Sequence, residues 1–448
     1  MKSTKNTVLV IDSGGRGSAL VAKYLQSKYV SKVIAIPGND LMQISTHKPV
    51  RIYSQLKTTS ISEILEICIK ENVSLVDVAQ DNAIEVGLVD VLMENNIPVV
   101  GPTRLAGQIE WDKAWARNFG ERHHIPQPVF KVCHSQKEGF YYLKSQPDQP
   151  WFIKASGLAE GKGALPASNN KEARRMVKEM ARFGKSGQTF LIEKWLRSED
   201  NQPAEEFSIF VICDGEHYKI IGSAQDHKRV NNFDEGENTG GMGCSSSPLV
   251  LTPQIEKEIE TKILKPTIGG FKDENIAYKG ILYLGGILVK HKGQLTPYVI
   301  EFNSRWGDPE AEVLLPGLKN DLFEIGMAIV EGEIHKVSIQ TDHNSRVVVA
   351  AVSKGYPTNY EKVKGKEIFG LDEARKIKGV HLYGAGVKVI GKKYYAHGGR
   401  LFHIVGEGKS VIQARQKAYE AMALIHIDGN NLHYRTDIGW KDVQRSQR

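Results

Sequence analysis

Short apolar runs alternate with amphipathic stretches through the first hundred residues. The apolar and β-branched run 7–11 is followed by a glycine-rich segment, 12–18, and then by helical periodicity over 19–25. The same patterns predict strands at 32–36, 74–79 and 98–100 and helices at 62–71 and 83–95. Strands that alternate with helices indicate a small parallel α/β domain, which we place at residues 1–103.

The pattern changes after residue 103. A long helix is predicted at 105–120, and strands are predicted at 151–154, 190–196, 205–212 and 298–300. Further on we expect a strand at 346–352 and a helix at 410–425, and we expect the polar residues 441–448 to be frayed. Because 448 residues are too many for one core, we predict a central domain at 104–335 and a C-terminal domain at 336–448.

The strand at 298–300 continues into polar residues at alternating positions. Glu301 and Asn303 are two residues apart and therefore point to the same face of a strand. A carboxylate and an amide oxygen are hard ligands of the kind that Mg²⁺ prefers, and Arg305 adds a planar cation suited to a carboxylate or phosphate. This combination suits phosphoryl transfer from a metal-bound nucleotide. The alternative is an edge strand with solvated polar residues.

A second candidate is the strand that ends at Lys154 and the loop that follows it. The loop contains Gly157, Gly161 and Gly163 and a second lysine, Lys162. It lacks the Gly-Lys-Ser/Thr ending of a Walker A sequence. A mobile glycine loop that closes over phosphates explains it, and a flexible hairpin is the alternative.

Residues 225–243 combine a charged run with a glycine-rich turn. Asp226, His227, Lys228 and Arg229 are costly to bury without partners. Together with the turn at 238–243 they predict a polar cleft, and a charged surface loop is the alternative.

The glycine-rich segment near the N-terminus suits an anion, because glycines let backbone amides approach it and a helix N-terminus adds a positive dipole. The segment also resembles a dinucleotide-binding fingerprint, in which Asp40 has about the spacing of a ribose ligand. That interpretation would make the protein a nicotinamide-dependent oxidoreductase, but it leaves residues 225–243 and 301–310 unexplained.

Composition narrows the class of protein. The chain is 25% charged and 41% hydrophobic, which is ordinary for a soluble globular protein. It has no apolar run of membrane-spanning length, and its first residues lack a signal-peptide pattern. A net charge of +7 suits anionic small substrates and does not by itself indicate nucleic acid. The four scattered cysteines lack zinc-ligand spacing, so we expect cytosolic thiols and a cytoplasmic location.

Four segments, in order along the chain, resemble the glycinamide ribonucleotide synthetase family, whose members are ATP-grasp enzymes of purine biosynthesis. The similarity covers essentially the whole chain. Its most specific segments are residues 157–163, 225–229, 238–243 and 301–310. Residues 398–400 and 437–439 match the C-terminal end of the family.

The resemblance implies a multidomain ATP-grasp fold with an N-terminal parallel α/β domain and a small C-terminal α+β domain. It places a mobile subdomain at about 125–195. It also implies that ATP phosphorylates the carboxylate of glycine and that the amine of 5-phosphoribosylamine then attacks the acyl phosphate, which yields glycinamide ribonucleotide, ADP and phosphate. No protein nucleophile is needed, because the protein supplies positioning and charge neutralisation.

The resemblance further implies roles for individual residues. The ligands of Mg²⁺ or Mn²⁺ would be Glu301 and Asn303, and the acyl phosphate would be lined by Arg305, Asp226 and Lys228. ATP would be bound by Lys113, Lys154, Gly157, Gly161, Lys162, Gly163, Glu193, Leu196 and Glu206. The other substrates would be bound by Gly14, Gly15, Arg16, Asn238, Gly240, Gly241 and Asp308. For Lys113 alone, a solvated helix lysine is the alternative.

The sequence departs from the family pattern mainly at the expected amine-binding end. Gly17 and Ser18 stand where the family usually has Glu and His, and residues 79–81 replace a usual Gly-Pro-Glu. Glu312 stands where Gln is usual, and Ser156 where Asp is usual. Phosphoribosylamine is the expected acceptor, and a diverged paralogue that ligates another amine or amino acid is the alternative.

A catalytically idle relative is a further alternative, and retention of Glu301, Asn303, Lys154 and Arg305 argues against it. We expect small-molecule substrates only, with no nucleic acid or membrane partner. The protein is expected to be a monomer or a weak homo-oligomer.

Overall fold

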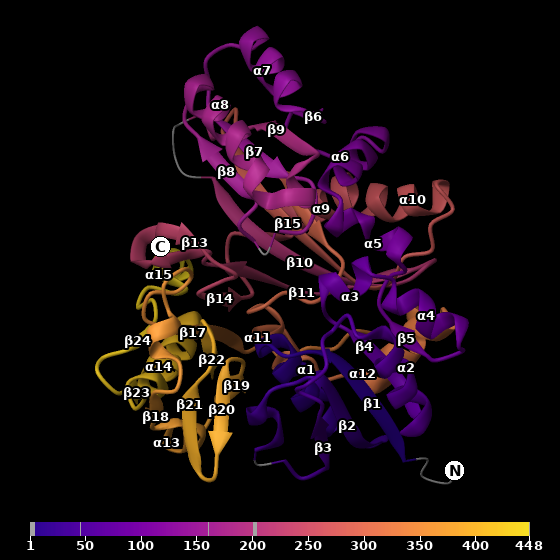
Figure 1. The fold of residues 1–448 in the computed structure, drawn as a ribbon, viewed down its shortest axis with the longest axis vertical. Coiled ribbons are helices and arrows are strands. Elements are labelled where there is room, and N and C mark those ends of the chain that lie inside the picture. The colour runs from indigo at the N-terminus through magenta and orange to yellow at the C-terminus, as the bar shows by residue number, and fades with distance from the viewer. Residues whose placement is uncertain (1–4, 45, 160, 200–203, 448) are drawn as a thin grey trace.

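The structure is a computed structural model that describes residues 5–44, 46–159, 161–199 and 204–447. Along the chain, the N-terminal sheet comes first and a small sheet at the far end of the molecule comes second. A long antiparallel sheet and the C-terminal segment follow (Figure 1). The N-terminal and C-terminal segments lie beside each other at the end opposite the small sheet.

The N-terminal sheet is parallel, as predicted. Its strand order is β3-β2-β1-β4-β5, with β1 at Asn6–Asp12, β2 at Val30–Pro37, β3 at Val50–Ile52, β4 at Val73–Val78 and β5 at Val99–Val100. Its helices are α1 (Gly15–Gln26), α2 (Ile61–Lys70), α3 (Asp81–Glu85) and α4 (Leu88–Glu94). The helix predicted at 83–95 is divided in two because Gly87 adopts a left-handed conformation with φ of 85°.

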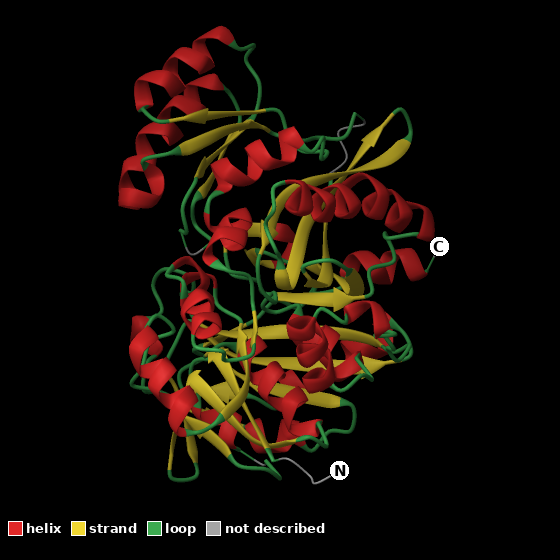
Figure 2. Ribbon diagram, turned by 90° about the vertical axis from the view of Figure 1, so that its right-hand side faces the viewer, coloured by secondary structure: helices red, strands yellow, loops and turns green. Residues whose placement is uncertain are grey.

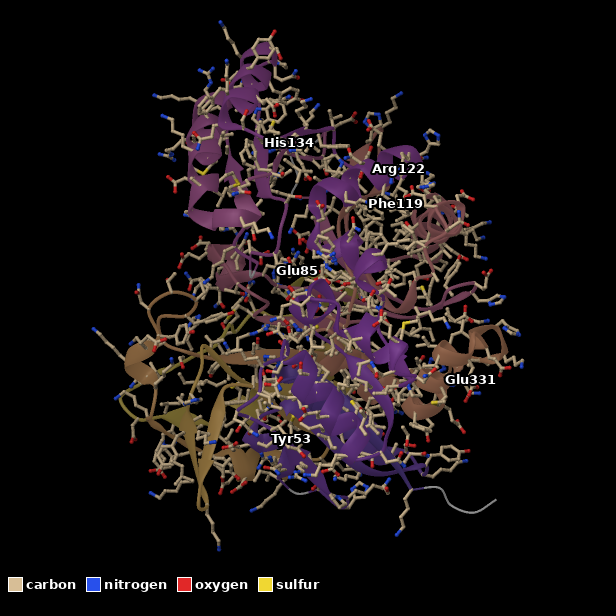
Figure 3. All side chains as sticks on the ribbon, turned by 45° about the vertical axis from the view of Figure 1, so that its right-hand side comes forward. Tyr53, Glu85, Phe119, Arg122, His134 and Glu331 are labelled. Carbon is tan, nitrogen blue, oxygen red and sulfur yellow. The ribbon has the colours of Figure 1, made fainter. Side chains whose placement is uncertain are left out.

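The helix predicted at 105–120 is also divided, into α5 (Arg104–Trp111) and α6 (Lys113–Arg122). Asp112 between them has extended backbone angles, and its carboxylate accepts hydrogen bonds from Trp115 N at 3.1 Å and from Ser156 Oγ at 2.7 Å. Asp112 is therefore the N-cap of a new helix, which the helical periodicity alone did not reveal. Phe119 and Arg122 lie on α6 (Figure 3), and Arg122 Nε pairs with Glu274 at 2.9 Å.

The small sheet has the strand order β6-β9-β7-β8 and is antiparallel. Its strands are β6 (Phe130–Cys133), β7 (Trp151–Ala155), β8 (Ala164–Ala167) and β9 (Phe190–Lys194), and the helices α7 (Gln136–Ser145) and α8 (Asn170–Glu179) pack against it. Figure 2 shows this unit standing apart from the rest of the chain at one end.

One long sheet runs through the central and C-terminal segments in the order β16-β15-β10-β11-β14-β17-β22-β19, with β24 (Leu432–His433) added to β17. Its strands are β10 (Glu205–Asp214), β11 (Tyr218–Asp226), β14 (Gly243–Ser246), β15 (Lys279–His291), β16 (Gln294–Asn303), β17 (Ser345–Ser353), β19 (Val380–Gly384) and β22 (Arg400–Gly408). The pairing of β14 with β17 joins the two segments without a break in the hydrogen-bond ladder. The associated helices are α9 (Pro253–Ile259), α10 (Lys265–Asp273), α11 (Ala311–Leu314) and α12 (Leu322–Glu331).

The C-terminal segment adds a four-stranded sheet in the order β20-β21-β18-β23. Its elements are β18 (Glu367–Phe369), α13 (Leu371–Arg375), β20 (Val387–Ile390), β21 (Lys393–Ala396), α14 (Val411–Met422), β23 (His426–Ile427) and α15 (Trp440–Ser446). This arrangement confirms the mixed α/β, multidomain fold class.

The expectation that residues 441–448 are frayed is wrong for residues 441–446, which belong to α15. Asp442 is buried and accepts hydrogen bonds from Ser245 Oγ and Leu249 N, each at 3.0 Å. Arg445 forms an ion pair with Glu205 at the start of β10. These contacts fix a polar segment that would fray in isolation.

Asp40 also has a role that the sequence did not indicate. Its carboxylate accepts a hydrogen bond from Val389 N at 2.8 Å and pairs with Lys388 Nζ at 3.2 Å. Asp40 therefore ties the N-terminal segment to β20, and this contact argues against the ribose-binding interpretation. Among the described residues, no helix is both long and apolar enough to span a membrane.

Candidate active site

The predicted metal-binding side chains lie near the end of β16. Asn303 faces Tyr283 of β15, and Glu301 faces Gly285, where a Cβ atom would lie 3.2 Å from Glu301 Cγ. The glycine thus leaves room for the carboxylate, whose side chain is 35% exposed. Asn303 Oδ1 accepts a hydrogen bond from Arg305 Nη2 at 3.1 Å, and Asn303 Nδ2 is buried without a hydrogen-bond partner.

Cations surround Glu301. Burial raises the pKa of this carboxyl, but Lys228, Lys154 and Lys113 outweigh burial and lower the pKa below its ordinary value. The Nζ atom of Lys228 lies 3.8 Å from Glu301 Oε1. Glu301 is therefore held as an anion that faces the cleft, and with the Asn303 amide oxygen it makes a donor set that fits a hard divalent cation.

Lys154, at the end of β7, is part of a buried ion-pair group. Its Nζ lies 2.7 Å from Glu193 Oε2, and Arg117 binds the same carboxylate through Nε and Nη2 at 2.8 and 3.2 Å. Burial opposes ionisation of Glu193, but Arg117 and Lys154 lower its pKa to about 2. Glu193 therefore holds Lys154 in place, with Lys154 Nζ 3.4 Å from the carbonyl oxygen of Ile300.

The glycine loop after β7 is attached to the start of α6. Ser156 O accepts a hydrogen bond from Lys113 N at 3.0 Å, and Ser156 Oγ accepts one from Ala114 N at 2.9 Å. Gly161 and Lys162 are exposed, whereas Gly163 is buried and its carbonyl accepts from Ala155 N at 2.8 Å. Gly157 N donates to Ser186 O at 3.1 Å. Glu160 lies outside the described residues.

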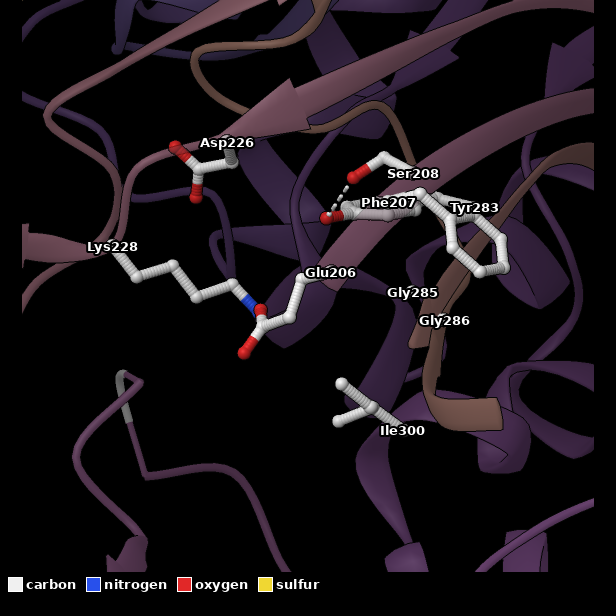
Figure 4. A pocket seen from close by; sticks show the side chains of 9 residues that line it. All are labelled: Glu206, Phe207, Ser208, Asp226, Lys228, Tyr283, Gly285, Gly286 and Ile300. Carbon is white, nitrogen blue, oxygen red and sulfur yellow. Dashed lines mark hydrogen bonds and ion pairs between the residues drawn. The ribbon is translucent and has the colours of Figure 1, made fainter. Parts of the chain in front are cut away.

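Lys228 lines a small pocket together with Ile300 of β16 (Figure 4). Its Nζ pairs with Glu206 Oε2 at 3.0 Å. Burial disfavours the ammonium, but Glu206 and Glu301 raise its pKa well above the ordinary value. Asp226 also lines the pocket, and burial and Glu310 raise its pKa. Leu196, the remaining predicted nucleotide contact, is partly exposed after β9.

Arg305 is fixed by contacts on both sides. Its Nη2 lies 2.8 Å from Glu110 Oε1 and donates to Asn303 Oδ1, while Nη1 donates to Trp306 O at 3.1 Å. Glu110 Oε2 also accepts hydrogen bonds from Ser304 N at 2.7 Å and Ser304 Oγ at 2.8 Å. Glu110 thus positions both the guanidinium and the backbone beside Asn303.

The N-terminal glycine turn contains a carboxylate that the sequence reading overlooked. Asp12 accepts hydrogen bonds from Gly14 N and from Gln80 Nε2, the latter at 2.8 Å, and it pairs with Arg16 Nε at 2.7 Å. A Cβ atom at Gly17 would lie 2.6 Å from Asp12 Oδ1, so the absence of a side chain at position 17 leaves space for Asp12. Arg16 is buried and neutralised by Asp12.

Asp308 lies where the N-terminal turn meets the segment that follows β16. Its Oδ2 accepts a hydrogen bond from Arg16 N at 3.3 Å, and its Oδ1 lies 3.1 Å from Arg400 Nη1. Arg400 also donates to Gly240 O at 2.8 Å, so the turn at 238–243 and Asp308 converge on one guanidinium. Asn238 ends β13 (Glu235–Asn238), which pairs with β12 (Arg229–Asn231), and is partly exposed.

A buried acid–base pair lies beneath this junction. Glu312 Oε1 and His403 Nδ1 are 2.5 Å apart, both side chains are fully buried, and His403 Nδ1 is 3.7 Å from Asp308 Oδ1. A Cβ atom at Gly15 would collide with both side chains, so the turn rests directly on the pair. Burial and Asp308 raise the pKa of Glu312 well above 4.5, and burial lowers the pKa of His403 to about 4 although Asp308 opposes that change.

The Glu312–His403 pair makes the free energy of unfolding depend on pH. We predict that Glu312→Gln reverses the direction of this dependence. At neutral pH the folded pair is uncharged and holds one proton, with Glu312 donating to His403. The unfolded chain holds none above pH 6.5, the ordinary pKa of His. The folded wild-type protein therefore loses stability as pH rises above 6.5, whereas the glutamine variant has no such loss.

The variant instead loses stability as pH falls below 6.5, because only its unfolded histidine takes up a proton. Urea unfolding at pH 6, 7, 8 and 9 measures both slopes. Glu331→Gln, an exposed change on α12, is the matched control. Parallel curves for the wild type and Glu312→Gln would contradict a neutral pair.

The structure joins Lys154 to Glu193, Lys228 to Glu206 and Glu301, and Arg305 to Asn303. A second set of contacts joins Arg16 and Gly240 to Asp308 and Arg400. The structure also adds several residues that sequence reasoning missed. The additions are Asp12, Glu110, Arg117, Arg400 and His403. Arg400 belongs to a Gly-Gly-Arg segment that the resemblance had matched, and Asp12 adjoins the glycine turn. The other three are contributed by elements far away in the sequence, and no spacing signal could have found them.

Glu301, Asn303, Lys154 and the glycine loop of the small sheet all lie within residues 111–311, which match the model of an ATP-grasp domain, so the chain belongs to the ATP-grasp class of enzymes. The same fold is seen in the biotin carboxylase domain of Hydrogenobacter thermophilus 2-oxoglutarate carboxylase, with a TM-score of 0.69 and 15% identity over 96% of this chain and 91% of that chain.

Models of the three domains of phosphoribosylglycinamide synthetase match the chain in order: the N domain at residues 6–110, the ATP-grasp domain at 111–311 and the C domain at 346–441. The chain therefore belongs to the phosphoribosylglycinamide synthetase family. It is 35% identical to a phosphoribosylamine–glycine ligase of Chlorobaculum tepidum over 97% of this chain and 99% of that protein. A solved phosphoribosylamine–glycine ligase of Thermotoga maritima has a TM-score of 0.79 and 28% identity, covering 97% and 100% of the two chains.

Proposed function

We propose that the protein is a carbon–nitrogen ligase that joins glycine to 5-phosphoribosylamine at the expense of ATP. The products are glycinamide ribonucleotide, ADP and phosphate, and the reaction is a step of de novo purine biosynthesis. The observation that carries the proposal is the ordered match of all three family domains across residues 6–441, in a chain whose cleft gathers Glu301, Asn303, Lys154 and Arg305.

At the nucleotide end, Lys154 and Lys113 neutralise the phosphates of ATP. The glycine loop with Gly157, Gly161, Lys162 and Gly163 covers the phosphates from the small sheet, and the segment 125–195 moves with it. Glu193 and the backbone at Leu196 lie toward the adenine. Glu206 binds the ribose hydroxyls after its ion pair with Lys228 breaks. Support comes from the ion pairs that already fix Lys154 and from the attachment of the loop to α6 through Ser156.

Glu301 and Asn303 hold the divalent metal, which is Mg²⁺ or Mn²⁺. When bound, the metal neutralises phosphate charge and fixes the orientation of the transferred group. The exposed oxygen of Glu301 and the hard character of both donors support this assignment.

Arg305 neutralises the acyl phosphate of glycine, and Lys228 and Asp226 line the same region. Charge neutralisation of this kind is a large part of phosphoryl-transfer catalysis. Cys244, which lies opposite Asp226 in the pairing of β14 with β11, is fully buried, and burial raises its pKa well above the ordinary value. A thiol intermediate at Cys244 is therefore not part of the proposed reaction.

The acceptor binds where the N-terminal turn, Asp308 and the turn with Asn238, Gly240 and Gly241 meet. Asp308 holds the amine as its anionic partner, and Gly14, Gly15 and Arg16 shape the opposite wall. One observation favours a second candidate, a ligase for a different amine or amino acid: Asp12 already neutralises Arg16, and Asp308 already accepts the hydrogen bond of the Arg16 amide. These contacts use up donors that a phosphate would otherwise take.

Isotope transfer tests the chemistry independently of the acceptor's identity. With glycine labelled by ¹⁸O in its carboxylate, one labelled oxygen is expected in the released phosphate, because the acyl phosphate passes it to phosphorus when the amide forms. Phosphate free of label during turnover would exclude the acyl phosphate.

A further inference from the structure

Besides the catalytic cleft, the described residues contain two groups of metal-ligating side chains whose ligand atoms lie within 4.8 Å of one another. One is Asp308, Glu312 and His403. In that group the 2.5 Å contact between Glu312 and His403 leaves no room for an ion between them, and Arg400 already pairs with Asp308. The other group is Asp214, His217 and His335, and it lies at a distance from the cleft.

We propose that Asp214, His217 and His335 form a second metal site, which binds a divalent transition-metal ion such as Zn²⁺ or Ni²⁺. Asp214 ends β10, His217 lies in the turn before β11, and His335 lies in the short helix η6 (Ile334–Lys336). Asp214 is eight residues along β10 from Glu206, or about 26 Å at the rise of a strand. The site is therefore separate from the nucleotide cleft.

The carboxylate of this site is preorganised. Asp214 Oδ1 accepts hydrogen bonds from Glu216 N at 2.9 Å and His217 N at 2.6 Å, and Oδ2 accepts one from Ile334 N at 2.9 Å. These backbone donors outweigh burial and lower the pKa of Asp214, so the group is an anion. Its side chain is fully buried.

One ligand atom from each imidazole and one carboxylate oxygen all lie within 4.8 Å of one another. His217 Nδ1 is 3.4 Å from Asp214 Oδ2, and the rings of His217 and His335 have centroids 4.6 Å apart at 44°. Two ligand atoms of a tetrahedral zinc ion, each bonded at about 2.0–2.1 Å, lie about 3.4 Å apart. Both histidines are exposed, so rotation of His335 can complete the set while water fills the remaining position.

The donor set selects the metal. Two imidazoles with one carboxylate suit Zn²⁺, Ni²⁺ or Cu²⁺, whereas Mg²⁺ prefers oxygen ligands throughout. The ion would connect the β10–β11 turn to η6, the segment through which the chain leaves α12 and proceeds toward β17. Its expected consequence is a more stable junction, with no part in the ligation chemistry.

The test is a titration of EDTA-treated, dialysed full-length protein with Zn²⁺, using a competing chromophoric chelator, in excess Mg²⁺ so that the cleft is filled. The wild type is expected to bind one Zn²⁺. His217→Gln and His335→Gln are each expected to weaken binding at least about tenfold, in line with loss of one of three protein ligands. His343→Gln, an exposed histidine on the same connecting segment, is the control and should bind as the wild type does.

Two further measurements distinguish specific binding at this site from nonspecific binding of Zn²⁺ to the protein surface. Added Zn²⁺ should raise the melting temperature of the wild type but not of the His217→Gln, His335→Gln double variant, and all proteins should melt alike in EDTA. Co²⁺ should give visible absorption bands that the double variant lacks. Equal Zn²⁺ affinity in the wild type and the double variant, or the absence of a Zn²⁺ site in the wild type, would overturn the proposal.

Discussion

Replacing Glu301 by Gln is expected to lower the rate of ADP formation at least about a hundredfold, comparable to the loss of one well-placed electrostatic group. The change keeps the shape of the side chain and removes a charge that Lys228, Lys154 and Lys113 now face. A neutral amide binds a divalent cation less well than a carboxylate does. Saturating Mg²⁺ should restore only part of the activity.

Steady-state turnover over a range of Mg²⁺ concentrations measures this effect, and thermal melting verifies that the fold is intact. Glu331→Gln is the control, because Glu331 is an exposed carboxylate at the end of α12 (Figure 3). Near-normal turnover of Glu301→Gln at saturating Mg²⁺ would remove Glu301 from the metal site.

Arg305→Lys is expected to slow amide formation on the order of a hundredfold while ATP affinity changes little. Lysine keeps the charge but cannot reach Glu110, Asn303 and the Trp306 carbonyl together, as the planar guanidinium does. The charge would remain in the region but lose the fixed orientation that matches an acyl phosphate.

Single-turnover rates and an independent ATP-binding titration separate the two effects. Arg122→Lys is a matched control. The Arg122 guanidinium also pairs with a carboxylate, that of Glu274, through two hydrogen bonds, but at an exposed position. If ATP binding and turnover weakened equally in Arg305→Lys, Arg305 would belong to the nucleotide site instead.

Sequence patterns could bring together only those candidate residues that are neighbours along one strand or loop. Glu301 and Asn303 are two residues apart, and strand geometry alone places them on one face. Lys154 ends an apolar run, and a glycine loop follows it directly. The alternation of strands and helices in the first hundred residues could likewise be predicted from local periodicity alone. The parallel N-terminal sheet confirms that prediction.

The contacts that hold these side chains in place were not predictable in the same way. Glu110 meets Arg305 across 195 residues of sequence, and Glu312 meets His403 across 91. Such pairs depend on how sheets and helices pack, and one sequence carries no periodic signal for them. The split of the helix at Asp112 is similar, because Ser156, from the loop after β7, supports the cap.

The N-terminal turn shows how a local reading can be incomplete. Gly14, Gly15 and Arg16 alone indicate an anion site. In the structure, the anions present are the side chains of Asp12 and Asp308. Asp12 belongs to the preceding strand, and its carboxylate turns back toward Arg16, so only the folded chain shows that the cation is already paired. The identity of the acceptor depends on this turn.

The most direct test of the central claim supplies the purified protein with glycine, ATP, Mg²⁺ and freshly generated 5-phosphoribosylamine and measures the products by mass spectrometry. The account predicts glycinamide ribonucleotide together with one ADP and one phosphate per amide formed, and no product when any one substrate is omitted. Absence of glycinamide ribonucleotide, while another amine gives an ATP-dependent amide with glycine, would contradict it.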